Sequence, residues 1–300
     1  MGEGQETKTR EEPNVEILER GEIFFFYRPK VEREEAHGPQ DVQRLYIVLQ
    51  PESGERPIEQ KQDTDSSQHG SSQEINIEKQ MLLRFIVMGR KSLPDPSSKR
   101  GRPYWGFVEM VTTKSEDIKL ALKGEEYDTA TRGNSHKPPA RALAEGIYRI
   151  LRHNRGGKRM HTHLVYKLEY PPEDEKNEAQ ESLNIEREGS FLIQIKNPDQ
   201  HGSEFRGLES KRKATFPAHL QGQFGNLRYH TADPPDFLNY EGCEFLLISA
   251  SDDIEEELGL QLETEIDAQK QNQHDASCSD LVRTFGETAS TRAFLKGTWV

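Results

Sequence analysis

The chain has 300 residues, of which 32% are hydrophobic and 31% are charged, and its formal net charge at pH 7 is −12. This acidic balance argues against general nucleic-acid binding, because affinity for phosphate backbones depends on clustered lysine and arginine. No apolar run approaches the roughly 20 residues that a membrane-spanning helix needs. The first residues also lack the apolar stretch of a secretory signal and the composition of a transit peptide. We therefore expect a soluble protein without membrane contact, located in the cytoplasm or the nucleus.

Eight segments beyond an acidic, flexible N-terminus at 1–20 have the composition of β-strands. They are rich in β-branched and aromatic residues, and proline, glycine or charged residues bound them. No helical pattern of 10–15 residues separates consecutive strands, which favours antiparallel pairing. The sequence thus predicts a mainly β (α+β) fold, an antiparallel β-rich barrel or sandwich. The eight predicted strands are 22–28, 44–50, 81–88, 104–111, 146–153, 161–170, 190–196 and 243–249.

The fourth strand of each half runs into a similar short helical sequence, which indicates an internal repeat. A serine, an acidic residue, an aspartate and an isoleucine are followed by a leucine, a pattern typical of a capped helix start. Two tandem units of four strands plus a helix would explain the match. The alternative is coincidence, since any β-rich chain offers such similarities. The matched residues are Ser115, Asp117, Ile118 and Leu122 in the first copy and Ser251, Asp253, Ile254 and Leu258 in the second.

Changes in composition divide the chain into units. Residues 52–80 carry many Ser, Gln and Glu but few large apolar side chains, so we expect a disordered insertion there. The remaining boundaries follow from the two halves and the polar C-terminal composition. We expect a first β-rich unit at 21–124, a linker at 125–145, a second β-rich unit at 146–262 and a polar tail at 263–300.

Basic residues follow the strands that should end on the same side of each half. In an antiparallel meander the first and third strands run in the same direction, so their exits lie close together. Guanidinium and ammonium groups gathered there could hold a small anionic ligand. Alternatively, Glu32, Glu34 and Glu35 neutralise an ordinary polar strand end. The exits carry Arg28, Lys30, Arg90 and Lys91 in the first half and Arg152, Arg155 and Lys158 in the second.

The strand at 161–170 contains a His-x-His pattern. Side chains alternate along a strand, so His161 and His163 share a face and could bind a metal together with His153. The alternative is a polar strand face without metal. In either case the alternation predicts a buried face of Leu164, Tyr166 and Leu168 and an opposite, wetter face of His161, His163 and Lys167.

No nucleotide-binding, nucleophile-elbow or zinc-binding motif occurs in the sequence. Two functions therefore remain open. The first is a non-enzymatic binding or adaptor protein that recognises a small anionic ligand or a protein partner. The second is a metal-dependent hydrolase built on the His-x-His strand. The sequence decides neither whether the chain is an enzyme nor which cofactor it would use.

Overall fold

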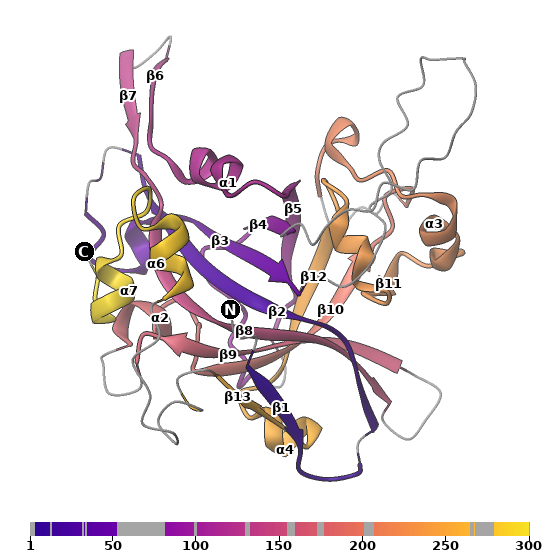
Figure 1. The fold of residues 1–300 in the computed structure, drawn as a ribbon. Coiled ribbons are helices and arrows are strands. Elements are labelled where there is room, and N and C mark those ends of the chain that lie inside the picture. The colour runs from indigo at the N-terminus through magenta and orange to yellow at the C-terminus, as the bar shows by residue number, and fades with distance from the viewer. Residues whose placement is uncertain are drawn as a thin grey trace, which may run out of the picture.

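The computed structural model describes residues 4–12, 14–31, 33, 35–52, 82–98, 101–129, 133–154, 160–172, 177–200, 207–264, 267 and 279–299. The fold is mainly β, and its centre is an eight-stranded antiparallel barrel (Figure 1). Each half of the chain supplies one four-stranded meander. The first contains β2 (Asn14–Pro29), β3 (Val42–Pro51), β4 (Leu83–Met88) and β5 (Tyr104–Thr112); the second contains β8 (Arg141–Asn154), β9 (Met160–Tyr170), β10 (Glu188–Lys196) and β12 (Glu244–Ser251). All eight predicted strands and their antiparallel pairing are confirmed, and the barrel alternative is the correct one.

The two meanders join symmetrically. The first strand of one meander pairs with the first strand of the other, β2 with β8, and the last strands, β5 and β12, pair in the same way. A short helix follows each meander: α1 (Ser115–Leu122) comes after β5, and α4 (Ile254–Leu258) comes after β12. The two predicted units are therefore halves of a single barrel, because the open edges of each meander are paired only by the other.

The matched positions of the two short helices have equivalent roles, although the predicted caps differ. The isoleucine and leucine of each helix are buried against the outer wall of the barrel. Asp253, and not Ser251, caps α4, because its side chain accepts a hydrogen bond from the backbone N–H of Glu256. Gly259 ends α4 with a φ of 60°, a conformation that favours glycine.

Aliphatic and aromatic side chains fill the barrel interior. Phe25, Tyr166 and Phe191 form a continuous aromatic contact across it, with ring centroids 5.3 Å apart for Phe25–Tyr166 and 6.2 Å apart for Tyr166–Phe191. The predicted burial of Leu164, Tyr166 and Leu168 is confirmed. Packed side chains thus make the interior a core, and the candidate cavity described below lies on the outside of the barrel.

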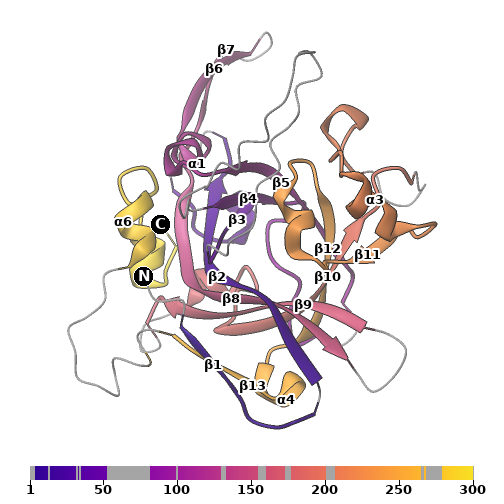
Figure 2. The same cartoon turned by 45° about the vertical axis from the view of Figure 1, so that its right-hand side comes forward.

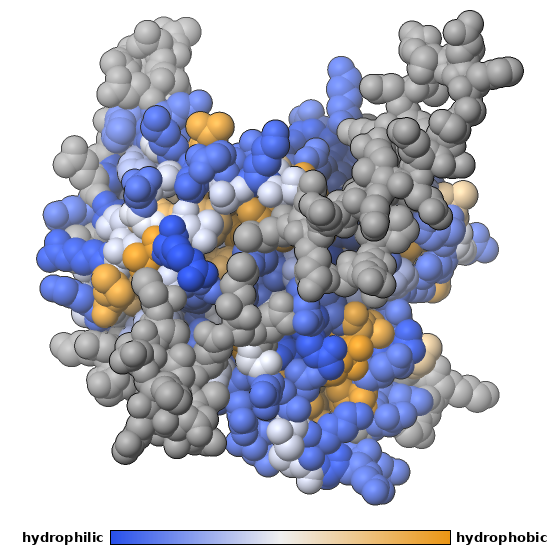
Figure 3. All heavy atoms as spheres, viewed as in Figure 1, coloured by the Kyte–Doolittle hydropathy of each residue, from blue (hydrophilic) through white to orange (hydrophobic). Residues whose placement is uncertain are grey.

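Two sets of elements cover the outer wall. α1, α6 (Asp280–Phe285) and α7 (Arg292–Lys296) pack over the first meander. On the other side, α4, β13 (Leu260–Glu263) and β1 (Gln5–Lys8) cover β8 and β9, as both ribbon views show (Figures 1 and 2). No helix of the described residues is long and apolar enough to cross a membrane. Hydrophilic side chains dominate the face in Figure 3, and hydrophobic ones reach it in small groups.

The segments outside the predicted strands contain more regular structure than expected. Part of the N-terminal segment predicted to be flexible, 1–20, forms β1 and the start of β2. The predicted linker contains the projecting hairpin of β6 (Glu125–Thr129) and β7 (Gly133–Lys137) (Figure 1). The insertion predicted at 52–80 lies outside the described residues apart from Glu52. The remaining elements are α2 (Glu178–Glu181), α3 (Ala218–Phe224), β11 (Tyr229–Thr231) and the 3-10 turns Pro39–Asp41, Ser210–Arg212 and Pro235–Asn239.

The end of the predicted polar tail docks on the barrel. Residues 279–299 of this tail contain α6 and α7. The buried carboxylate of Glu145 on β8 accepts hydrogen bonds from the backbone N–H groups of Asp280 and Leu281, at 2.9 and 3.2 Å, and from the Ser279 hydroxyl. A carboxylate at a helix start is favourable because the first N–H groups of a helix lack partners within it.

Candidate functional site

A cavity of about 590 Å³ lies between β1 and the first half of β2. Its walls carry charged side chains of both signs, and aliphatic side chains complete the surface. Volumes of this size accommodate ligands of ordinary small-molecule size. The lining residues are Glu6, Lys8, Asn14, Val15, Glu16, Ile17, Arg20 and Leu260.

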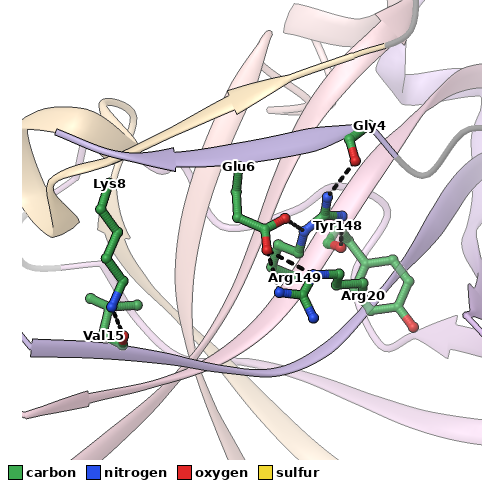
Figure 4. Close-up of polar contacts among 7 residues, drawn as sticks. All are labelled: Gly4, Glu6, Lys8, Val15, Arg20, Tyr148 and Arg149. Atoms are coloured by element: carbon green, nitrogen blue, oxygen red, sulfur yellow. Dashed lines mark hydrogen bonds and ion pairs between the residues drawn. The ribbon is translucent and has the colours of Figure 1, made fainter. Parts of the chain in front are cut away.

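β1 forms one wall of the cavity because two sets of contacts hold it against the barrel. Along one edge it pairs with β13, with Lys8 opposite Leu260. From the face directed at the barrel, the Glu6 carboxylate accepts hydrogen bonds from Arg149 Nε at 2.8 Å and from Arg20 Nε at 2.7 Å (Figure 4). Arg149 is fully buried on β8 and also donates to the carbonyl of Gly4. This ion pair therefore attaches the N-terminal strand to the outer wall.

The Glu6 carboxylate is a fixed anion. Partial burial raises the pKa of Glu6, but the hydrogen bonds and charges of Arg20 and Arg149 outweigh burial, so that the pKa lies below its ordinary value. At neutral pH Glu6 is ionised, and its carboxylate already accepts hydrogen bonds from both arginines. It is therefore an anchor for the cavity wall and does not offer a free carboxylate to a ligand.

Lys8 is the cation of the cavity that a ligand can recruit. Its ammonium group donates to the backbone carbonyl of Val15 at 2.8 Å (Figure 4). Among the described residues no carboxylate lies within ion-pair distance of it, and the residue is exposed. Beside this cation lie the aliphatic side chains of Val15, Ile17 and Leu260. The cavity thus combines a cation that has no anionic partner among the described residues with a small aliphatic surface, of which Ile17 is the partly exposed member.

The structure brings only some of the predicted basic residues together. Tyr46 of β3 pairs with Phe26 of β2 and with Val87 of β4, so the ends of β2 and β4 lie on the same side of the sheet, as predicted. Lys30, Arg90 and Lys91 are exposed there, and Arg90 lies over the ring of Tyr104.

Arg28 lies at the same end but has a structural role. It is fully buried, and its guanidinium donates to the carbonyls of Ala121 and Pro138 and to the hydroxyl of Tyr46. Since those acceptors belong to the end of α1 and to the segment before β8, Arg28 fastens these segments to β2. Anion binding at this end stays a prediction, and it depends on the three exposed residues.

Arg152, the described basic residue of the second half, lies at the opposite end of the barrel. Arg152 belongs to the antiparallel neighbour of β2, where it is paired with Glu16, far along the strand from Arg28. Its side chain forms ion pairs with Glu16 at 2.8 Å and with Asp233 at 2.6 Å. Arg155 and Lys158 lie outside the described residues. Arg152 therefore does not share a patch with the basic residues of the first half.

The three predicted histidine ligands share one face of the β8–β9 pair, but that face is not the wet one expected. His153 is opposite His161, and its Nδ1 lies 3.3 Å from His163 Nε2. His163 is buried, 2% exposed, because α4 covers this part of the wall; its Nδ1 is 3.0 Å from Ser190 Oγ and 3.9 Å from Glu257. The prediction of a wetter face is therefore wrong for His163. In the described part of the chain, no group of three or more His, Cys, Asp or Glu is placed to hold a metal.

Sequence reasoning missed the cavity because seven of its eight lining residues lie in the segment assigned to a flexible N-terminus. One signal was present: Glu6 and Lys8, and likewise Val15 and Ile17, are two positions apart, the spacing that puts side chains on one face of a strand. No protein-family model matches the chain, and no curated protein or solved structure matches it. Function therefore has to be argued from the geometry of the site.

Proposed function

We propose that the chain is a non-enzymatic binding protein that holds the anionic group of a ligand in the cavity between β1 and β2. The observation that carries this proposal is the Lys8 ammonium group, which among the described residues donates only to the Val15 carbonyl and lies beside the partly exposed side chain of Ile17. A ligand carboxylate or phosphate that approaches Lys8 gains a charge-assisted hydrogen bond. The apolar part of such a ligand would lie against Ile17, which is partly exposed, because Val15 and Leu260 are already buried, at 3% and 1% exposed.

The side chains of the cavity favour binding over catalysis. The lining residues include no serine, cysteine or histidine that could act as a nucleophile or as a general base of neutral pKa. Glu6 is held by two arginines, and Glu16 is paired with Arg152. Each lining carboxylate thus has a cationic partner already, which leaves Lys8 as the group that selects a ligand of opposite charge.

The test is calorimetric titration of the full chain with acetate, hexanoate and octanoate. We expect the longer carboxylates to bind more tightly, since added methylene groups become buried. Lys8→Met should weaken octanoate binding about 10-fold or more, as expected for the loss of one charged hydrogen bond. Lys91→Met is the matched control, because it removes an exposed lysine at the barrel end predicted to bind anions.

The two variants separate the two anion sites. Unchanged binding in Lys91→Met together with weakened binding in Lys8→Met supports the cavity. The reverse result would place the ligand at the barrel end, and the cavity proposal would be wrong. It would be equally wrong if none of the three carboxylates bound.

A further inference from the structure

In the described part of the chain, the first half of β2 has a strand beside it on only one edge. β8 pairs with β2 from Asn14 to Tyr27, whereas the register of β3 begins at Gly21. The backbone N–H of Glu52 donates to the carbonyl of Arg20, where this pairing ends. Within the described residues, no strand lies along the other edge of 14–19. An edge of this kind presents backbone donors and acceptors that another strand can pair with.

The candidate cavity follows this open edge. Five of its eight lining residues belong to the first half of β2. Figure 4 shows the Lys8 side chain extending from β1 to the backbone of β2, where its ammonium group meets the carbonyl of Val15. A side-chain donor thus occupies an acceptor on β2 that an incoming backbone N–H could take over.

We propose that the ligand of this cavity is an extended peptide segment of a partner protein, which adds to the edge of β2 and carries an acidic side chain for Lys8. This inference rests on the function proposed above and names its ligand. The peptide backbone would supply the hydrogen bond that Val15 now receives from Lys8. The released ammonium group would then pair with the acidic side chain, so that neither group loses a partner.

The side chains along the edge of β2 determine which side chains a bound peptide should present to it. Val15 and Ile17 project from the same face of β2 and pack in the cluster under β1, α4 and β13. A bound strand places alternate side chains on that face, so a β-branched residue on the peptide can contact Ile17, which is partly exposed, whereas Val15 is 3% exposed. Backbone pairing provides affinity in this recognition mode, and the side-chain contacts provide selectivity. Because Lys8 is a cation, it would select peptides that carry an acidic side chain opposite it.

The experiment uses the full chain and three fluorescent peptides of equal length with blocked ends. All three alternate threonine and valine: the first has a central glutamate, the second a central glutamine, and the third the glutamate flanked by prolines. Proline lacks the backbone N–H and cannot form a regular ladder. Fluorescence anisotropy gives the affinities for the unmodified protein and for its Lys8→Met and Lys91→Met variants, and octanoate serves as the competitor.

We expect the glutamate peptide to bind with at least about 10-fold higher affinity than either of the other two peptides. Loss of one charged hydrogen bond in the glutamine peptide, or of several backbone hydrogen bonds in the proline peptide, would produce a change of this size. Lys8→Met should abolish the preference for glutamate over glutamine, and Lys91→Met should keep it. Octanoate should displace the glutamate peptide. In amide NMR spectra the shifts should concentrate at Glu6, Val15 and Ile17.

Other results overturn the inference in distinguishable ways. Equal binding of the proline-containing peptide would rule out strand addition, and equal binding of the glutamine peptide would rule out acidic selectivity. If no peptide binds while octanoate still binds through Lys8, the peptide inference fails and the proposed function stands. If neither octanoate nor any peptide responds to Lys8→Met, both proposals fail.

Discussion

Arg84→Met should destabilise the protein strongly, because it would leave a buried carboxylate without its cation. Arg84 projects into the barrel from β4 and is 1% exposed. Its two terminal nitrogens donate to the two oxygens of Glu19 at 2.6 and 2.8 Å, and Nε donates to Asn239 at 2.8 Å. The hydroxyl of Tyr148 also donates to Glu19, at 2.8 Å. Removing one member of such a buried pair costs about 3–5 kcal/mol.

Urea denaturation of the full chain measures this loss, with unfolding followed by both fluorescence and circular dichroism. The control is the double variant Glu19→Gln, Arg84→Met, which removes both charges. Because the double variant has no unpaired buried charge, we expect it to lose less stability than the two single variants added together. A free energy of unfolding for Arg84→Met within about 1 kcal/mol of the unmodified protein would refute this reasoning. The pair would then be solvated or dispensable.

Two further predictions concern the barrel wall and the attached N-terminal strand. Leu168→Ala should lower the free energy of unfolding by about 2–5 kcal/mol because it opens a space in the core; His161→Ala should change it far less, and similar losses in denaturation would contradict the assigned faces of β9. Glu6→Gln should lower the melting temperature at pH 7. The folded pKa of Glu6 is below its unfolded value, so the ionised group stabilises the fold above an unfolded pKa of about 4.3, and this contribution is lost as pH falls through the folded pKa. The difference in melting temperature should therefore vanish in acid, and a constant difference would argue against the ion pair as its cause.

The strands were predictable from the sequence because each is bounded by turn residues and dense in β-branched and aromatic side chains. The segment EIFFFYR is one example, and it lies fully within β2. Alternation along β9 also predicted its inner face correctly. These features are local, so a single strand is enough to show them.

The site depended on contacts between distant segments, which local patterns do not reveal. Glu6 becomes a fixed anion because Arg149 comes to lie under β1 and binds its carboxylate together with the nearby Arg20, and His163 becomes buried because α4 folds over β9. The guanidinium of Arg28 is a group that could bind an anion, yet it donates hydrogen bonds to the carbonyls at the end of α1. In each case the deciding partner is more than 90 residues away in the chain.

Because β2 pairs with β8 and β5 pairs with β12, the first meander cannot close both of its edges until the second meander has been synthesised. β2 is made early, but its partner β8 emerges from the ribosome only after all of the first meander, and β12, the partner of β5, emerges later still. Pairings between such distant segments form slowly, since a long loop has to close before they are gained. Until then the nascent first meander displays two unpaired edges and the apolar side chains of FFFY. We expect this intermediate to be the species most prone to aggregation and most dependent on chaperones during folding.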